Sequence, residues 1–250
     1  MKQEINTKNE ITWCPGCPNF LILAGIKKVL EKLISQGYKQ EEFAMATGIG
    51  CHAKIFDYLN ISGIYGLHGR VLPTAQGMKI GNPKLTVLGF GGDGDTYAEG
   101  IAHFVHACRY NHDMIMIVHD NRAFSLTTGQ ATPTSQQGYK TKAEPQGEMY
   151  VPLNPVKLAL ASGCKFIART SAKDLVHMQE ILEKAIKHKG FSFVEILQDC
   201  LIFNKEVNNL DKLMYKIKDN KDKAVAEKLV GEWDYNSVGG KIPAGVLYEE

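Results

Sequence analysis

The chain has 250 residues, of which 44% are hydrophobic and 22% are charged, and its formal net charge is +2. These values are typical of a globular protein, and so small a charge argues against nucleic acid or an anionic membrane as partner. The longest apolar runs fall far short of the ~18 residues that a spanning helix needs. Because residues 1–6 are mostly polar, we expect no signal peptide and a cytoplasmic protein. Its six cysteines are then expected to be reduced, metal-bound or buried.

The first motif along the chain is the turn Cys14-Pro15-Gly16-Cys17. Two cysteines at this spacing can direct their thiolates at one centre, and three interpretations compete. A thioredoxin-like redox pair needs a strand before the turn, but the preceding segment is short and polar. A zinc ribbon needs a second closely spaced pair, which the sequence lacks. The third interpretation is an iron–sulfur cluster whose other ligands come from distant parts of the chain.

A helix is predicted over 19–36, where apolar residues recur on one face, and apolar runs at 43–46 and 191–197 predict buried strands. Cys51 and Cys200 each follow one of these strands. Parallel strands end at a common edge of the sheet, so these cysteines can converge with the Cys-x-x-Cys turn. The two other cysteines, Cys108 and Cys164, are predicted to be buried as small apolar residues.

Short apolar runs at 85–90 and 114–118 predict two parallel strands, joined by a helix over 98–110. Asp93 and Asn121 each follow one of these strands, and ligands of open parallel sheets bind beyond the carboxyl ends of the strands. A carboxylate and an amide oxygen suit Mg²⁺, which prefers oxygen ligands and commonly binds phosphates as well. The expected ligand is therefore a Mg²⁺-diphosphate.

The run Gly92-Asp93-Gly94, followed after 26 residues by Asn121, resembles the thiamine diphosphate motif. The glycines are expected to leave room for a bulky anion to approach the backbone. The resemblance implies that Asp93, the Asn121 side chain and the Ala123 carbonyl hold Mg²⁺ on the diphosphate of the cofactor.

The cysteine pattern narrows the resemblance. Together with the thiamine motif and the run from Leu126 to Thr134, it resembles the β subunit of 2-oxoacid:ferredoxin oxidoreductases over roughly residues 13–205. The resemblance implies a [4Fe–4S] cluster with four ligands, namely Cys14, Cys17, Cys51 and Cys200. The chain departs from the family at Pro18 and His52, where many members carry Gly and Ser.

The same resemblance assigns further roles. Lys54 would pair with the substrate carboxylate, and Leu126 would line the substrate pocket. From the residues alone, Lys54 is expected to be an ordinary solvated lysine. For Leu126, packing inside its own loop is as well supported by the residues as a place in the substrate pocket. Additional residues expected at the cofactor are His68, Arg70, Gly92, Gly94, Asp95, Thr127 and Thr128. His103 and His106 share a helix but have no evident third ligand, so no metal site is expected there.

The remaining elements complete an α/β fold. Residues 122–155 show almost no periodicity and are expected to wrap the cofactor and meet a partner chain. Predicted elements after this loop are a helix at 154–162, a strand at 166–169, a helix at 173–189 opened by a capping box at Ser171 and Asp174, a strand to residue 198, and a helix near 223–232.

We therefore predict a doubly wound parallel sheet with the thiamine diphosphate-binding fold over residues 1–203. Residues 204–250 are predicted to form a C-terminal extension, whose apolar end at 242–248 contacts another subunit.

By resemblance the chain is the β subunit of an enzyme that oxidatively decarboxylates a 2-oxoacid with coenzyme A, or runs the reverse carboxylation, and passes electrons to ferredoxin. The glutamate that activates the cofactor would come from a pyrimidine-binding domain on a partner α subunit, so the isolated chain is expected to turn over nothing. Two alternatives stay open: a subunit of a non-redox thiamine diphosphate decarboxylase, and a non-catalytic iron–sulfur electron-transfer subunit. The identity of the 2-oxoacid is not specified by these residues.

Overall fold

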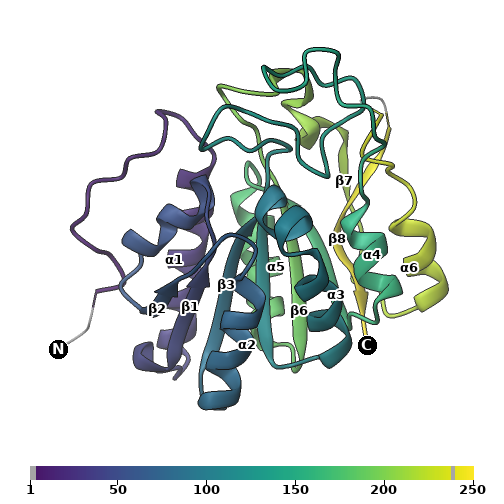
Figure 1. Ribbon diagram of the computed structural model, residues 1–250. Helices are drawn as coiled ribbons and strands as arrows, with labels where there is room; N and C mark the ends of the chain where they lie inside the picture. Colours follow the sequence, from purple (N-terminus) through teal and green to yellow (C-terminus); the bar gives the residue numbers. More distant parts are fainter. Residues whose placement is uncertain (1–3, 238–239) are drawn as a thin grey trace.

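The computed structural model describes residues 4–237 and 240–250. Its centre is an eight-stranded sheet in the order β2-β1-β3-β4-β6-β5-β8-β7 (Figure 1). Strands β1 to β6 are mutually parallel, whereas β8 runs antiparallel to β5. The predicted doubly wound parallel sheet is confirmed, with an antiparallel edge added to it.

The strands are β1 (Phe43–Thr47), β2 (Ser62–Tyr65), β3 (Thr86–Gly92), β4 (Met114–Asp120), β5 (Phe166–Ser171), β6 (Phe191–Leu197), β7 (Met214–Lys216) and β8 (Ile242–Glu249). The α-helices are α1 (Asn19–Ser35), α2 (Val71–Gly81), α3 (Ile101–Tyr110), α4 (Pro155–Ala161), α5 (Leu175–Lys187) and α6 (Lys223–Leu229). None of the described helices is long and apolar enough to cross a membrane.

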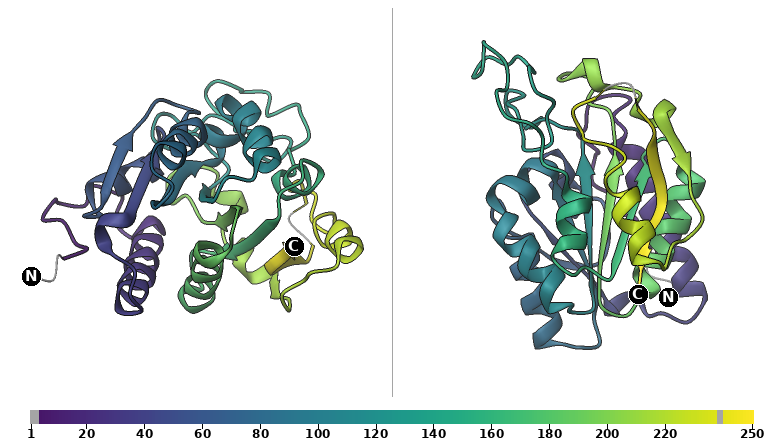
Figure 2. Two further views of the ribbon diagram at one scale, coloured as in Figure 1. Left: turned by 90° about the horizontal axis from the view of Figure 1, so that it is seen from below. Right: turned by 90° about the vertical axis from the view of Figure 1, so that its right-hand side faces the viewer.

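Helices cover both faces of the sheet, as Figure 2 shows from two further directions. Helices α1 and α5 contribute to one buried hydrophobic cluster. Helices α2, α3, α4 and α6 contribute to another, on the opposite face. Strands β3 and β4 send alternate side chains into the two clusters, since Leu88 and Ile117 lie in the first and Val87 and Met116 in the second. These central strands are therefore buried on both sides, as their continuous apolar sequences predict.

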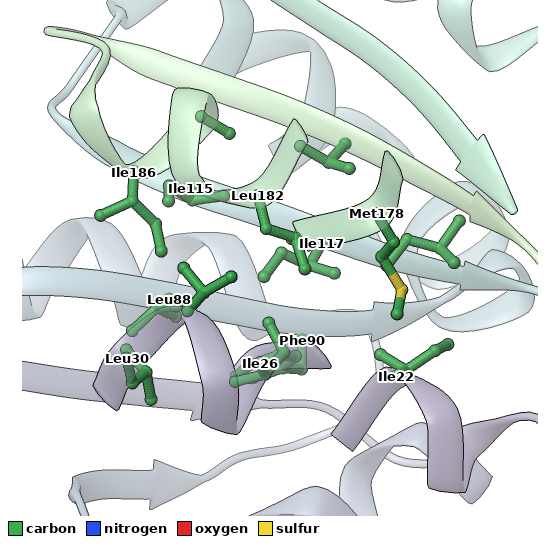
Figure 3. Packing of buried hydrophobic residues seen from close by; sticks show 14 of the residues in the cluster. Ile22, Ile26, Leu30, Leu88, Phe90, Ile115, Ile117, Met178, Leu182 and Ile186 are labelled. Carbon is green, nitrogen blue, oxygen red and sulfur yellow. The ribbon is translucent and has the colours of Figure 1, made fainter. Parts of the chain in front are cut away.

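Helices α1 and α5 pack against each other and against the same face of the sheet. The side chains in this layer include Ile22, Ile26 and Leu30 of α1, Leu88 and Phe90 of β3, Ile115 and Ile117 of β4, and Met178, Leu182 and Ile186 of α5 (Figure 3). Gly25 permits this approach, because a Cβ there would lie 2.6 Å from the Cε of Met178. Each fully buried aliphatic side chain contributes about 1.5–3 kcal/mol to stability.

Two predicted helices begin differently from expectation. Asp174, not Ser171, caps α5: its carboxylate accepts the backbone N–H of His177 at 3.1 Å, whereas the Ser171 hydroxyl accepts from Lys173 in the preceding turn. The predicted capping box is therefore wrong by one turn. The helix expected over 98–110 is α3 preceded by a π-helical segment, Asp95–Glu99, directly after the glycine-rich turn.

The C-terminal residues belong to the same sheet as the rest of the chain. Strand β8 pairs with β5, and Trp233 and Tyr235 are fully buried beside Ile242. Residues 242–248 are predicted to contact another subunit, and in the structure their apolar side chains pack into the chain's own core. A subunit contact by residues 204–250 stays a prediction.

Candidate functional site

Two cavities lie next to each other beyond the carboxyl ends of the parallel strands. The first, here called the Asp93 cavity, measures about 80 Å³. It is lined by residues that follow β1, β3 and β4, together with the loop at 123–127. The second, the cysteine cavity, measures about 160 Å³. Cys51, Asn121, Ser125 and Leu126 line both cavities and so form the wall between them.

Asp93 lies at the base of the Asp93 cavity and is 2% exposed. One carboxylate oxygen accepts hydrogen bonds from the hydroxyls of Thr132, at 2.6 Å, and Thr134, at 3.2 Å. Burial raises the pKa of Asp93 to about 6, and the hydroxyl donors limit that rise. A cation bound at this carboxylate would favour its ionised form, so the buried oxygen suits a metal–phosphate ligand.

Asn121 and Ala123 line the same cavity, as the resemblance predicted. The Asn121 carbonyl oxygen accepts the N–H of Ala123 at 3.1 Å, and its amide donates to the Ser125 hydroxyl at 2.9 Å. These bonds fix the direction of the Asn121 side chain. The structure therefore brings Asp93, Asn121 and Ala123 to one cavity, and their binding of Mg²⁺ stays a prediction.

Buried polar side chains, here called the buried polar layer, hold the loop that follows β4. Arg122 belongs to this layer, and its backbone lies in the left-handed region with φ of 60°. Its guanidinium donates to the carbonyls of Thr134 and Tyr235 and lies over the Trp233 ring. Thr134 links the layer to the cavity, because its hydroxyl contacts Asp93 and also Asp120, at 3.0 Å. The C-terminal segment thus helps to position the loop that follows β4.

Asp95 connects three loops at the other side of the cavity. Its carboxylate accepts the backbone N–H groups of Gly69, at 2.7 Å, and Ile49, at 3.2 Å, and lies 3.2 Å from His68 and 3.6 Å from His52. Burial raises the pKa of Asp95, but His52 and the two N–H groups outweigh burial and hold the pKa below its usual value. Asp95 thus lines the cavity, and its main contacts connect the loops that contain Ile49 and Gly69.

The glycines on either side of Asp93 allow two rings to pack close to the backbone. A Cβ on Gly92 would lie 2.8 Å from the His52 ring, and a Cβ on Gly94 would lie 2.2 Å from the Phe124 ring. Both glycines line the Asp93 cavity, and their predicted role of admitting an anion to the backbone stays a prediction. His52, one of the two departures from the family pattern, fits because position 92 carries no side chain.

All four predicted cluster cysteines line the cysteine cavity. Cys14 is exposed, and Cys17, Cys51 and Cys200 are partly buried. Burial raises the pKa of Cys17 to about 11. Burial likewise raises the pKa of Cys51, and a hydrogen bond from Ser125 opposes that rise. Within residues 4–237 and 240–250, no three His, Cys, Asp or Glu side chains gather tightly enough to hold one metal ion.

Several predicted site residues lie elsewhere. Lys54 lines the cysteine cavity rather than the Asp93 cavity, and its ammonium contacts the backbone carbonyl and hydroxyl of Thr12 at 3.2 and 3.1 Å. Arg70 donates to the Glu99 carbonyl at 3.1 Å and does not line either cavity. Thr128 also lies outside both linings, whereas His68, Leu126 and Thr127 line the Asp93 cavity.

His119 and Asn19 were not singled out from the sequence, yet they connect the two cavities. His119 lines the Asp93 cavity, Asn19 lines the cysteine cavity, and their side chains are joined at 2.8 Å. Both side chains are buried. The sequence feature that could have pointed to His119 is its position at the end of a predicted strand, two residues before Asn121. Cys108 and Cys164 are buried in the hydrophobic core, as predicted.

Comparison with known proteins decides the family. Residues 48–196 match the family model described as the C-terminal TPP binding domain of thiamine pyrophosphate enzymes. The β subunit of a 2-oxoacid:ferredoxin oxidoreductase from Saccharolobus solfataricus is 38% identical, over 95% of this chain and 81% of that protein. The chain belongs to this family of β subunits.

Other relatives agree with this assignment. The 2-oxoglutarate synthase subunit KorB of Archaeoglobus fulgidus is 38% identical, over 75% of this chain and 69% of its own. A solved structure, 2-oxoglutarate:ferredoxin oxidoreductase from Magnetococcus marinus with 2-oxoglutarate, coenzyme A and succinyl-CoA bound, superposes with a TM-score of 0.92. That match has 32% identity and covers 98% of this chain and 84% of the other. The predicted family and fold are confirmed, and the roles of individual residues stay predictions.

Proposed function

We propose that this β subunit holds thiamine diphosphate with Mg²⁺ in the Asp93 cavity and a [4Fe–4S] cluster in the cysteine cavity. With a partner subunit it oxidatively decarboxylates a 2-oxoacid, transfers the acyl group to coenzyme A and reduces ferredoxin, or runs the reverse carboxylation. The observation that carries the proposal is the convergence of four cysteines, from segments up to 186 residues apart, on a cavity that shares a wall with Asp93's cavity.

The Asp93 cavity supplies the ligands that Mg²⁺ prefers. Asp93 offers a carboxylate, Asn121 an amide oxygen and Ala123 a backbone carbonyl, all at the end of neighbouring strands. Thr132 and Thr134 orient the carboxylate through their hydroxyls. When bound, the thiazolium of the cofactor supplies the carbanion that adds to the ketone and the electron sink for loss of CO₂.

The cysteine cavity supplies four thiols, the usual ligand set of a [4Fe–4S] cluster. Three of the thiols already accept hydrogen bonds: Cys200 from the Phe203 N–H at 3.3 Å, Cys51 from the Ser125 hydroxyl at 3.5 Å, and Cys17 from the Asn19 N–H. Donors of this kind stabilise negative charge on cluster sulfur. A cluster held there carries single electrons out of the site.

A partner chain is needed to complete the Asp93 cavity. Ligand pockets commonly measure about 300–1,000 Å³, and the Asp93 cavity has only about 80 Å³. Leu126, at its rim, is 45% exposed, and three consecutive apolar residues of the following loop, at 149–151, are more than 70% exposed. The relatives of this chain are named β subunits, and a β subunit implies a second kind of subunit. We infer that the partner covers this loop and carries the pyrimidine-binding domain.

Lys54 is proposed to contribute to substrate binding. It lines the cysteine cavity together with Leu126 and Cys51, which also line the Asp93 cavity. A lysine ammonium there attracts the carboxylate of a 2-oxoacid without acting as an acid or base. Relatives named for 2-oxoglutarate and relatives named for 2-oxoacids in general are similar to this chain at equal identity, so we propose the 2-oxoacid class as the substrate.

The proposal is tested by producing the chain anaerobically with its partner subunit and measuring ferredoxin reduction against a panel of 2-oxoacids. We expect reduction that requires coenzyme A, thiamine diphosphate and Mg²⁺, and no activity from the isolated chain. Decarboxylation to an aldehyde with no ferredoxin reduction would instead identify a non-redox decarboxylase. Oxidation of a 2-oxoacid by the isolated chain would refute the need for a partner.

A further inference from the structure

A short hydrogen-bonded chain crosses the wall between the two cavities. The Asn121 amide donates to the Ser125 hydroxyl at 2.9 Å, and the Ser125 hydroxyl donates to the Cys51 thiol at 3.5 Å. All three residues line both cavities. This row of hydrogen bonds begins at Asn121, which we propose as a Mg²⁺ ligand, and ends at Cys51, which we propose as a cluster ligand.

Ser125 differs from the other donors to these cysteines. Cys17 and Cys200 accept backbone N–H groups, from Asn19 and Phe203, which lie two or three residues away in the same local turns. Cys51 instead accepts a side-chain hydroxyl from a loop 74 residues distant in sequence. The Ser125 contact therefore joins two parts of the fold, whereas the others are local.

The loop holds Ser125 in place. The Phe124 N–H donates to the Gln130 carbonyl at 2.9 Å, and the Gly129 N–H donates to the Phe124 carbonyl at 3.0 Å. These bonds close the loop over residues 124–130 and fix the residue that precedes Ser125. Thr141, in the same stretch of residues 122–155, accepts the Glu144 N–H through its hydroxyl at 2.9 Å and lines neither cavity. Thr141 is therefore a matched hydroxyl for comparison.

We propose that Ser125 is a positioning residue that sets the reduction potential of the cluster and makes it respond to the occupancy of the Asp93 cavity. This inference rests on the proposed function. A hydroxyl that donates to a ligand sulfur stabilises the more negative, reduced cluster and so raises the potential. A cation at the Asn121 carbonyl oxygen polarises its amide, which strengthens the donation through Ser125 to Cys51. Binding of the Mg²⁺-cofactor then makes the cluster a better electron acceptor.

The test is a potentiometric titration of the cluster, followed by electron paramagnetic resonance, in the anaerobically purified complex with its partner. Wild type, Ser125→Ala, Ser125→Thr and Thr141→Ala are each titrated without cofactor and with saturating thiamine diphosphate and Mg²⁺. Without cofactor, we expect Ser125→Ala to have a more negative potential than wild type, and we expect Ser125→Thr and Thr141→Ala to match wild type. Adding cofactor raises the wild-type potential and raises that of Ser125→Ala by less.

Equal potentials for wild type and Ser125→Ala would overturn the inference while leaving the proposed function intact. An equal cofactor-induced shift in both would overturn the coupling through Ser125. A complex that contains no iron and gives no cluster signal would instead refute the proposed function, and the inference with it. Iron content is measured on every sample, so these failures are distinguished.

Discussion

The Asp93 cavity and the cysteine cavity share a wall, yet they are built in different ways. Asp93 and Asn121 follow adjacent strands of the sheet, and buried hydroxyls and a buried arginine hold their surroundings. Cys51 and Cys200 follow strands β1 and β6, whereas Cys14 and Cys17 lie in the turn before α1, and Cys14 is exposed. The first site is therefore fixed by the fold itself, whereas we expect the second to gain much of its order from the cluster that we propose for it.

The largest difference should appear when one cysteine is removed from each environment. Cys51→Ala deletes a ligand from the cysteine cavity, and we expect the complex to lose nearly all of its iron. Cys108→Ala deletes a thiol from the hydrophobic core and should keep the iron, at a stability cost of about 1 kcal/mol. Iron and labile sulfide are measured on both variants. Full iron content in Cys51→Ala would show that Cys51 is not a ligand.

A buried ion pair between strands β5 and β6 offers the next test. Arg169 contacts Glu195 at 2.6 Å, both are fully buried, and the Tyr235 hydroxyl donates to the same carboxylate. Glu195→Gln leaves the Arg169 charge uncompensated and should destabilise the protein by about 3–5 kcal/mol. Thermal unfolding of the apoprotein measures this loss, at about 2–4 °C of Tm per kcal/mol.

A matched carboxylate serves as control for that variant. Glu250 pairs with Lys165 at 3.1 Å on the surface, where both side chains are largely exposed. Glu250→Gln should change stability by less than about 1 kcal/mol. If the two variants unfold alike, the buried Arg169–Glu195 pair contributes no more to stability than the exposed pair does.

Removing the charge at Asp93 should affect the first cavity alone. We expect Asp93→Asn to weaken Mg²⁺-dependent binding of thiamine diphosphate by at least about 100-fold, because loss of even an indirect metal partner costs 10–100-fold. The iron content should stay at the wild-type level. Titration calorimetry with thiamine diphosphate and Mg²⁺ measures the affinity.

Asp113→Asn is the control at the other end of β4, where the Asp113 carboxylate contacts Lys79 at 3.0 Å. This variant should bind the cofactor as wild type does. Wild-type affinity in Asp93→Asn would remove Asp93 from the metal site.

The smallest expected effect concerns Lys54, which lines the cysteine cavity. Lys54→Gln keeps the hydrogen-bonding end of the side chain near Thr12 but removes its charge. We expect KM for the 2-oxoacid to rise about tenfold, the loss of one charge-assisted contact, with kcat and cofactor affinity little changed. Steady-state kinetics of the complex test this. An unchanged KM would assign Lys54 to the cysteine cavity alone.

Much of the fold was predictable because the central strands carry continuous apolar runs and α1 carries a regular apolar face. Helix α2 was not predicted. Pro73, Gly77 and Gly81 weaken its pattern, and only Val71, Leu72 and Ala75 are buried. Packing on the sheet, which a sequence does not display, stabilises this helix.

The candidate site was predictable where its residues follow strands. Asp93, Asn121, Cys51 and Cys200 were selected because each follows an apolar run that predicts a strand, and Cys14 and Cys17 were selected from the Cys-x-x-Cys turn. Arg122 and Tyr235 were missed because they interact across more than 100 residues, through a side chain and a backbone carbonyl. Such contacts depend on how the C-terminal segment folds back, and no local pattern reports them.

The most direct test of the account is the iron and labile sulfide content per chain after strictly anaerobic production with the partner subunit. A cluster held by Cys14, Cys17, Cys51 and Cys200 predicts about four of each per chain, with the spectrum of a [4Fe–4S] centre. Little iron, with zinc or free thiols in its place, would contradict the account. The chain would then bind thiamine diphosphate without an electron path to ferredoxin.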